Sequence, residues 1–176
     1  MNIKHWTKNL IRILVFGLYL MAPQLLTSAA GAENIRVDTK PVTLNQKQPE
    51  QNHVGQLHYH GGLVISSPRT NFGGFSALGV SLDGKRMIAI SDRGYRFAAS
   101  LIYNKESKLI GLNNTELGSL ANLNGTALKG KSDSDVESMC PGVDGEIIIG
   151  FERRHRIWRY LPRKIIPEPI VPPAEL

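Results

Sequence analysis

The sequence predicts an all-β protein built from antiparallel strands. Helix patterns are almost absent after residue 55, and short β-rich runs alternate there with Gly, Asn and Asp. Two Asp-Gly pairs, each between two such runs, recur about 60 residues apart. Because an Asp-Gly pair tolerates the positive φ of a tight turn, each pair indicates a β-hairpin.

The first 32 residues have the features of a removable export signal. Three basic residues and no acidic one flank an apolar stretch that runs from Ile13 to Leu26, and Ala30-Gly31-Ala32 fits the small-x-small cleavage rule. We therefore expect cleavage after Ala32 and a periplasmic or secreted protein. An uncleaved membrane anchor is the alternative, but the apolar run is shorter than the roughly 20 residues that a spanning helix needs. No stable membrane span is expected after cleavage.

The net charge of +6 belongs largely to this leader. The 144 residues after Ala32 carry 18 basic and 15 acidic side chains, a net charge of only +3, so no nucleic-acid partner is expected. A hydrophobic content of 41% is enough for a globular core. Cys140 is the single cysteine, which excludes an intramolecular disulfide. We predict a small buried core residue at Cys140, with a nucleophile as the alternative.

The remaining chain divides into three segments. Residues 33–55 are polar and without period, and we expect an extended arm or first edge strand there. The folded part covers residues 56–161 and contains eight strand-like runs: Gln56–Ser66, Phe75–Ser81, Arg86–Ser91, Phe97–Tyr103, Leu109–Leu112, Val136–Cys140, Glu146–Phe151 and Arg156–Leu161. Residues 162–176 include five prolines and are expected to end the fold as an extended tail instead of a packed element.

An internal repeat gives the most information about architecture. The segment from Ser76 to Arg93 aligns with the segment from Glu137 to Arg153, at an offset of 61 residues up to the Asp-Gly turn and 60 after it. Each copy contains a strand, a tight hairpin, a strand that ends in an acid-Arg pair, and a third strand. Repeated meanders of this kind predict propeller-type blades. The alternative is that two unrelated hairpins with the same turn align by chance.

Acid-Arg pairs stand at equivalent strand ends of the two copies. Asp92-Arg93 closes the second strand of the first copy, and Glu152-Arg153 closes that of the second. If the copies are blades, their strand ends lie at the same height and bring Asp92 and Glu152 near one rim.

Three further acids precede the second hairpin. Asp133, Asp135 and Glu137 share one face if their segment is a strand. Carboxylates that converge repel one another, and a hard cation such as Ca²⁺, which takes oxygen ligands, relieves that repulsion. We therefore predict a calcium or other hard-metal site at these converging carboxylates.

Two other interpretations of these residues stay open. Four neighbouring arginines could pair with the acids as structural salt bridges, namely Arg93, Arg153, Arg154 and Arg156. Alternatively, Arg93 and Arg153 could bind an anionic small-molecule substrate, because a guanidinium offers the bidentate fork that phosphate and carboxylate prefer.

The remaining motifs carry weaker signals. His58 and His60 would share a strand face, either as zinc or copper ligands or as rim histidines without metal. Gly73-Gly74 allows close backbone approach, which suits a tight entry into the first blade better than a phosphate cradle. The basic and aromatic run from Arg153 to Tyr160 alternates as a strand does and is not expected to bind nucleic acid.

Taken in order, several motifs resemble those of the phytase-like family. This is an exported β-propeller group that is described as having the esterase-like activity of phytase. The resemblance runs from about Gly55 to Tyr160 and is carried by Phe72-Gly-Gly-Phe-Ser-Ala-Leu78, Ser91-Asp-Arg-Gly94, Asp135-Val-Glu137 and Phe151-Glu-Arg-Arg-His-Arg-Ile157. It implies a propeller whose acidic residues face the central channel. Asp92, Asp135, Glu137 and Glu152 are the positions that match the acidic motifs of the family, and the resemblance therefore implies that they are the metal ligands.

The resemblance also implies a phosphoester or ester hydrolase, with a carboxylate-bound Ca²⁺ and with Arg93 and Arg153 holding the anion. A non-catalytic periplasmic binding or interaction module, or an inactive truncated fragment, is the alternative. Family members are about twice as long, and 144 residues supply about three blades where closed propellers use 4 to 8. We therefore expect a partial propeller, either a truncated N-terminal half or one that a second chain completes.

Overall fold

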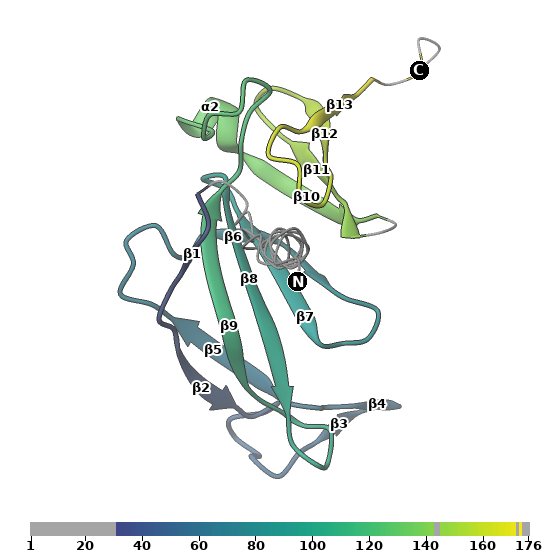
Figure 1. Cartoon of the computed structure of the whole chain (residues 1–176). Coiled ribbons are helices and arrows are strands. Elements are labelled where there is room, and N and C mark those ends of the chain that lie inside the picture. The colour runs from purple at the N-terminus through teal and green to yellow at the C-terminus, as the bar shows by residue number, and fades with distance from the viewer. Residues whose placement is uncertain (1–30, 143–144, 172, 174–176) are drawn as a thin grey trace, which may run out of the picture.

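The computed structural model describes residues 31–142, 145–171 and 173 (Figure 1). The described chain is almost entirely β-structure, in antiparallel sheets that do not close into a ring. The predicted fold class, an all-β and partial propeller-like architecture, is thereby confirmed. The predicted leader lies outside the described residues except for Gly31 and Ala32. Within the described ranges, no helix has the length and apolar character needed to cross a membrane.

Two sheets make up most of the fold. The larger sheet has the order β1-β9-β8-β7-β6 and the smaller one the order β10-β11-β12-β13. The strands of the larger sheet are β1 (Glu33–Asn34), β6 (Phe75–Val80), β7 (Arg86–Ser91), β8 (Tyr95–Tyr103) and β9 (Leu109–Ser119). Those of the smaller sheet are β10 (Val136–Pro141), β11 (Ile147–Phe151), β12 (Arg156–Tyr160) and β13 (Glu168–Ile170).

Shorter elements surround these sheets. A single helical turn, α2 (Lys131–Ser134), leads into β10. Two strand pairs lie at the end of the larger sheet that is far from the smaller sheet in Figure 1. They are β2 (Asp38–Val42) with β5 (Gly62–Ser66), and β3 (His53–Val54) with β4 (Leu57–His58). Part of the predicted arm is therefore strand β2.

The internal repeat corresponds to two four-stranded meanders, β6–β9 and β10–β13. The first strands of the two units start 61 residues apart, and so do the second strands. In each unit the first strand skips one residue in its pairing with the second, and the skipped residues are Ser76 and Glu137. The two units thus share strand order and bulge position, which favours a true repeat over a chance alignment of unrelated hairpins.

The first strands of the two meanders hold the sheets together. The Ser76 hydroxyl donates a hydrogen bond of 2.6 Å to the Val136 carbonyl across this boundary. Ile90, Val136 and Ile149 are fully buried between the sheets, in a cluster that also contains Trp158. Gly79 leaves room for the terminal methyl of Met139, which lies only 2.7 Å from the position of an added Cβ.

A second core lies on the other side of the larger sheet. Phe97 and Leu117 are buried there with Ile35, which follows β1. Phe72 covers Phe97 edge-on, with ring centroids 5.1 Å apart. The larger sheet thus has apolar side chains on both faces, as expected for a strand pattern with continuous apolar runs.

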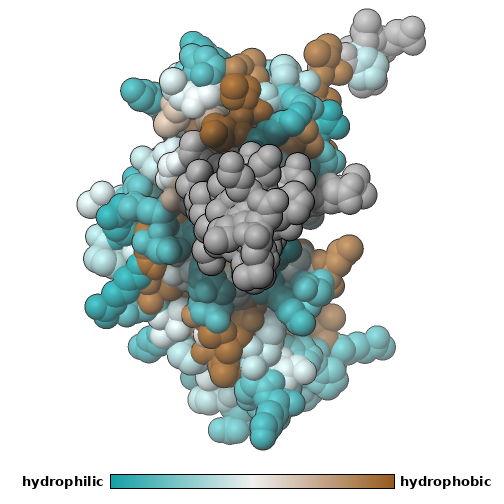
Figure 2. Space-filling view, viewed as in Figure 1, coloured by the Kyte–Doolittle hydropathy of each residue, from teal (hydrophilic) through white to brown (hydrophobic). Residues whose placement is uncertain are grey.

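Some large apolar side chains remain on the surface, among them Leu57, Leu82 and Val171. On the face seen in Figure 2, the described apolar residues form separate patches between hydrophilic ones. Single exposed apolar residues of this kind are ordinary in folded proteins.

Three local predictions are wrong. Cys140 is exposed, because β10 is an edge strand and the bulge at Glu137 sets which of its side chains face the core. The run from Gln56 to Ser66 is split between β4 and β5, since Gly61 adopts a φ of 108° and the His60 carbonyl accepts a hydrogen bond from Leu109 N. The proline-rich tail is not wholly unpacked, because its residues 168–170 form β13 on the edge of the smaller sheet.

The prediction that His58 and His60 share a strand face is also wrong, because the predicted strand is interrupted between β4 and β5. His60 lies outside the described strands, and His58 pairs across a hairpin with His53, at a ring-centroid distance of 6.3 Å. His58 and His60 therefore do not share a strand face. The second Asp-Gly turn falls partly outside the described residues, since Asp144 is not among them.

One buried hydrogen bond gives a stability prediction. The Tyr160 hydroxyl donates to the Ala121 carbonyl at 2.8 Å, and burial raises the pKa of Tyr160. Tyr160→Phe leaves that carbonyl without its donor, so we expect the free energy of unfolding in urea to fall by about 1–2 kcal/mol. Tyr103→Phe is the control, because its hydroxyl donates to Gly84 at the exposed surface and its loss should change less than about 0.5 kcal/mol. Equal losses in the two variants would contradict the prediction.

Candidate functional site

Three carboxylates meet where β10 begins and β11 ends. Asp135, Glu137 and Glu152 can each place a carboxylate oxygen so that all three lie within 4.8 Å of one another, and we call this group the acidic cluster. Antiparallel pairing of β10 with β11 joins these two strand ends, and Glu152 N donates to the Asp135 carbonyl at 2.9 Å. Asp135 is buried, whereas Glu137 and Glu152 are exposed.

A helical turn and a bulge position the cluster. Gly130, with a φ of 74°, starts α2, and the last residue of α2 leads directly to Asp135. The prediction that Asp133, Asp135 and Glu137 share a strand face is wrong, because Asp133 lies in α2 and the bulge interrupts the alternation at Glu137. Asp133 instead pairs with Arg154, with atoms 2.8 Å apart.

Asp135 is held by two cations. Arg153 Nε donates to Asp135 Oδ2 at 2.8 Å, and Lys131 Nζ lies 2.6 Å from Oδ1, as an ion pair rather than a well-aligned hydrogen bond. The pKa of Asp135 lies below its ordinary value, chiefly through Lys131, with burial opposing and Arg153 adding to the lowering. Structural salt bridges, the competing interpretation of the sequence, are therefore realised at Asp135.

Asp92 is connected to the cluster through the same lysine. Lys131 Nζ lies 2.9 Å from Asp92 Oδ2, and its two acidic neighbours, Asp135 before Asp92, raise the pKa of Lys131. The Gly-Gly motif makes room for this carboxylate, since a Cβ at Gly74 would lie 2.7 Å from Asp92 Oδ1. Asp92 N also donates to the Gly74 carbonyl at 2.9 Å. Lys131 thus joins the end of β7 to the start of β10.

The donor set fits a hard divalent cation. Asp135, Glu137 and Glu152 supply only oxygen atoms, which are the donors that such a cation prefers. Asp92, the fourth predicted ligand, is outside this group and is linked to Asp135 through Lys131. In the described part of the chain, neither Glu137 nor Glu152 has a basic side chain within ion-pair distance. These two glutamates are the exposed carboxylates of the cluster.

The predicted anion-binding arginines lie differently from each other. Arg153 is committed through Nε to Asp135, while Arg93 Nη1 donates to the Thr70 carbonyl at 3.4 Å. Both side chains are exposed. Their role in binding an anion stays a prediction.

One residue of this region, Lys131, was missed from the sequence. Lys131 could have been found by its four-residue spacing from Asp135, which places the two side chains together on a helical turn. Arg156, which was expected to pair with the acids, instead lies over the rings of Phe151 and Trp158, with its guanidinium carbon 3.8 Å and 4.5 Å from the ring centroids, and donates to the Asp133 carbonyl. Internal contacts of this kind explain why basic and aromatic residues alternate in β12.

The lowered pKa of Asp135 predicts how stability depends on pH. Its contribution is fully present above the ordinary value of 3.8 and is lost as the pH falls through the lower value of the folded state. The urea midpoint of the unmodified protein should therefore fall more between about pH 5 and pH 2 than that of Asp135→Asn. Asp38→Asn, at an exposed pair with Arg36, should keep the unmodified slope. Parallel pH profiles for all three proteins would refute this role.

Comparisons with known proteins place the cluster in a wider context. A family model described as Phytase-like, esterase-like activity of phytase, matches residues 70–176. The matched range contains both four-stranded meanders and the whole acidic cluster. Searches of curated proteins and of solved structures gave no match.

Proposed function

The chain belongs to the phytase-like family, and from this we propose that it hydrolyses phosphoester or carboxylester bonds at the acidic cluster. The observation that carries the proposal is the convergence of Asp135, Glu137 and Glu152 within the matched range. Two of these acids are exposed and have no ion-pair partner among the described residues. Like charges held this close favour a cation between them.

We assign three roles to the residues of this site: binding the cation, positioning the cluster and binding the substrate. Glu137 and Glu152 would hold a hard divalent cation such as Ca²⁺ together with Asp135, and the bound ion supplies polarisation of the ester oxygen and a more acidic water. Asp135, fixed by Lys131 and Arg153, positions the backbone from which Glu137 projects. Arg93 and the remaining donors of Arg153 bind the anionic part of the substrate.

We place this activity in the periplasm or outside the cell. The basic start, the apolar stretch and the small residues before Glu33 support export. Calcium is abundant in such compartments, which suits a site with exposed ligands.

A non-catalytic binding module is the second candidate. Lys131 pairs with both Asp135 and Asp92, an arrangement that also links the start of β10 to the end of β7 in the larger sheet. In addition, the described sheets do not close into a ring, so a second chain could complete the rim. This candidate predicts ligand binding without turnover.

Hydrolysis assays separate the two candidates. We expect the purified protein to release nitrophenolate from 4-nitrophenyl phosphate or 4-nitrophenyl acetate when Ca²⁺ is present, and the rate to fall to background with excess EGTA. Readdition of Ca²⁺ should restore it. Chelator-resistant turnover would remove the metal from the proposal. Absence of turnover, with a Ca²⁺-dependent rise in melting temperature, would favour the binding module.

A further inference from the structure

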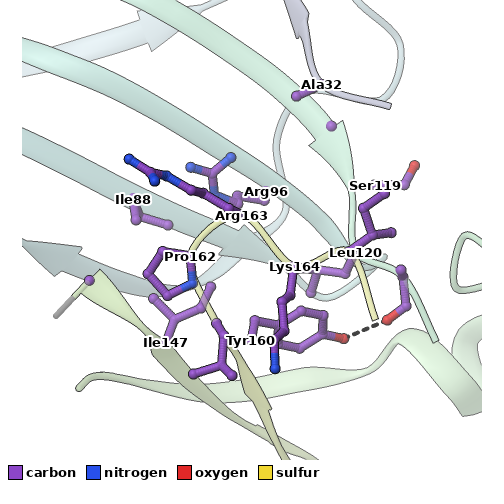
Figure 3. A pocket seen from close by; sticks show the side chains of 15 residues that line it. Ala32, Ile88, Arg96, Ser119, Leu120, Ile147, Tyr160, Pro162, Arg163 and Lys164 are labelled. Carbon is purple, nitrogen blue, oxygen red and sulfur yellow. Dashed lines mark hydrogen bonds between the residues drawn. The ribbon is translucent and has the colours of Figure 1, made fainter. Parts of the chain in front are cut away.

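A cavity lies between the two sheets, away from the acidic cluster. It has a volume of about 150 Å³ and is lined by residues of β7, β8, β9, β11 and β12 and of the segments after β9 and β12 (Figure 3). Ile147 and Tyr160 pair at this end of the smaller sheet, whereas Phe151 and Arg156 pair at the end that carries the cluster. Four residue steps along a strand separate the two ends, roughly 13 Å.

The cavity has a cationic rim. Arg96, Arg163 and Lys164 line it, and Figure 3 shows the side chains of Arg96 and Arg163 projecting from the same side. Lys164 is neutralised, since its Nζ lies 3.1 Å from Glu168 Oε1. Across residues 31–142 and 145–171, no carboxylate lies within ion-pair distance of Arg96 or Arg163. Among the described residues, these two guanidinium groups thus have no ion-pair partner, and Glu116 acts on Arg96 only from a greater distance.

Both arginines are in energetically unfavourable states, one through burial of its charge and the other through its backbone conformation. Arg96 is partly buried in the larger sheet, where desolvation lowers the pKa of its guanidinium against the opposing charge of Glu116. Arg163 has a φ of 64°, a left-handed conformation that is strained for a residue with a Cβ. A desolvated cation and a strained cation at one cavity are more easily explained by binding than by stability.

Most of the remaining side chains of the wall are apolar, with Ser119 as a polar exception. Ile88, Leu120, Ile147 and Pro162 line the cavity, and the ring of Tyr160 completes it. The Tyr160 hydroxyl is already bound to the Ala121 carbonyl, so Tyr160 offers its ring rather than a donor. The cavity thus combines an apolar surface with two donors suited to an oxyanion.

We propose that this cavity binds a small organic oxyanion, an apolar group that carries one carboxylate or phosphate. The head group accepts hydrogen bonds from Arg96 and Arg163, and the apolar body contacts Ile88, Leu120 and Ile147. The site is separate from the acidic cluster and does not depend on a metal or on hydrolysis.

Calorimetric titration of the purified protein with EGTA present tests the proposal. Benzoate and phenyl phosphate are the two oxyanion probes, while inorganic phosphate and phenol each lack one half of the ligand. We expect at least one oxyanion probe to bind saturably, and at least tenfold more tightly than inorganic phosphate or phenol. Which of the two binds more tightly identifies the head group. Failure of both probes to bind, or equal binding of inorganic phosphate, overturns the proposal.

Three variants locate the binding. Arg96→Met and Arg163→Gly each remove one cation, and we expect each to weaken the bound probe by roughly tenfold or more. Neither should lower the melting temperature, because one removes a desolvated charge and the other relieves a positive φ. Lys105→Gln removes an exposed charge in the loop between β8 and β9 and should bind as the unmodified protein does. Binding that survives both arginine replacements, or that Lys105→Gln weakens equally, refutes the site.

Discussion

Replacing Glu137 and Glu152 by glutamine together is expected to lower Ca²⁺-dependent hydrolysis of 4-nitrophenyl phosphate by about a hundredfold or more. The reason is that these are the two exposed carboxylates of the acidic cluster, and they carry the charge that Lys131 and Arg153 leave unbalanced. Glutamine keeps the size of each side chain but removes that charge. Calorimetry should show a matching loss of Ca²⁺ affinity.

Replacing Glu137 and Glu152 instead of Asp135 separates an effect on activity from an effect on folding. Asp135 is buried and paired, so its replacement would disturb the junction of the sheets as well as the site. Glu137 and Glu152 are exposed, and their double variant should melt within a few degrees of the unmodified protein without Ca²⁺. Glu50→Gln with Glu106→Gln removes the same charge elsewhere on the surface and should leave activity unchanged. Undiminished activity in the Glu137 and Glu152 double variant would refute the proposed centre.

Phe97→Ala is expected to lower the free energy of unfolding by about 3–5 kcal/mol. Phe97 has no exposed surface and contacts Phe72 and Phe75, with ring centroids 5.1 Å and 5.8 Å away. It lies on β8, between β7 and β9, so the sheet cannot easily collapse to fill the space. Urea unfolding followed by tryptophan fluorescence or circular dichroism measures the change.

A matched apolar truncation gives the control. Leu82 lies fully exposed in the turn between β6 and β7, and Leu82→Ala should change the unfolding free energy by less than about 0.5 kcal/mol. If the two alanine variants unfold at the same urea concentration, Phe97 does not anchor the second core.

The sequence predicts strands best where turn signals enclose them. The predicted Phe75–Ser81 and Arg86–Ser91 agree with β6 and β7 within a residue, because Asp83-Gly84 fixes the hairpin between them. β9 was predicted only over its first four residues, since Asn113–Ser119 is polar. That part is strand because it pairs with β8 on one side and, at its end, with β1 on the other. Such pairing cannot be read from a local pattern.

The candidate site was predictable in its composition but not in its pairing. Asp135, Glu137 and Glu152 come together, whereas Asp92, which the repeat placed near Glu152, is outside this group and is linked to Asp135 through Lys131. The ion pairs of Lys131 with Asp92 and Asp135 depend on how α2 lies against the end of β7. Arg96 drew no attention in the sequence, because its significance lies in partial burial beside a cavity formed by two sheets.

The shared bulge has a consequence for how such a chain could diversify after duplication of its meander. Ser76 and Glu137 occupy the same skipped position in the two copies. In one copy the side chain fastens the neighbouring sheet through the Val136 carbonyl, and in the other it stands exposed in the acidic cluster. The same backbone position can therefore carry a side chain that bonds to the neighbouring sheet in one meander and an exposed carboxylate in the other.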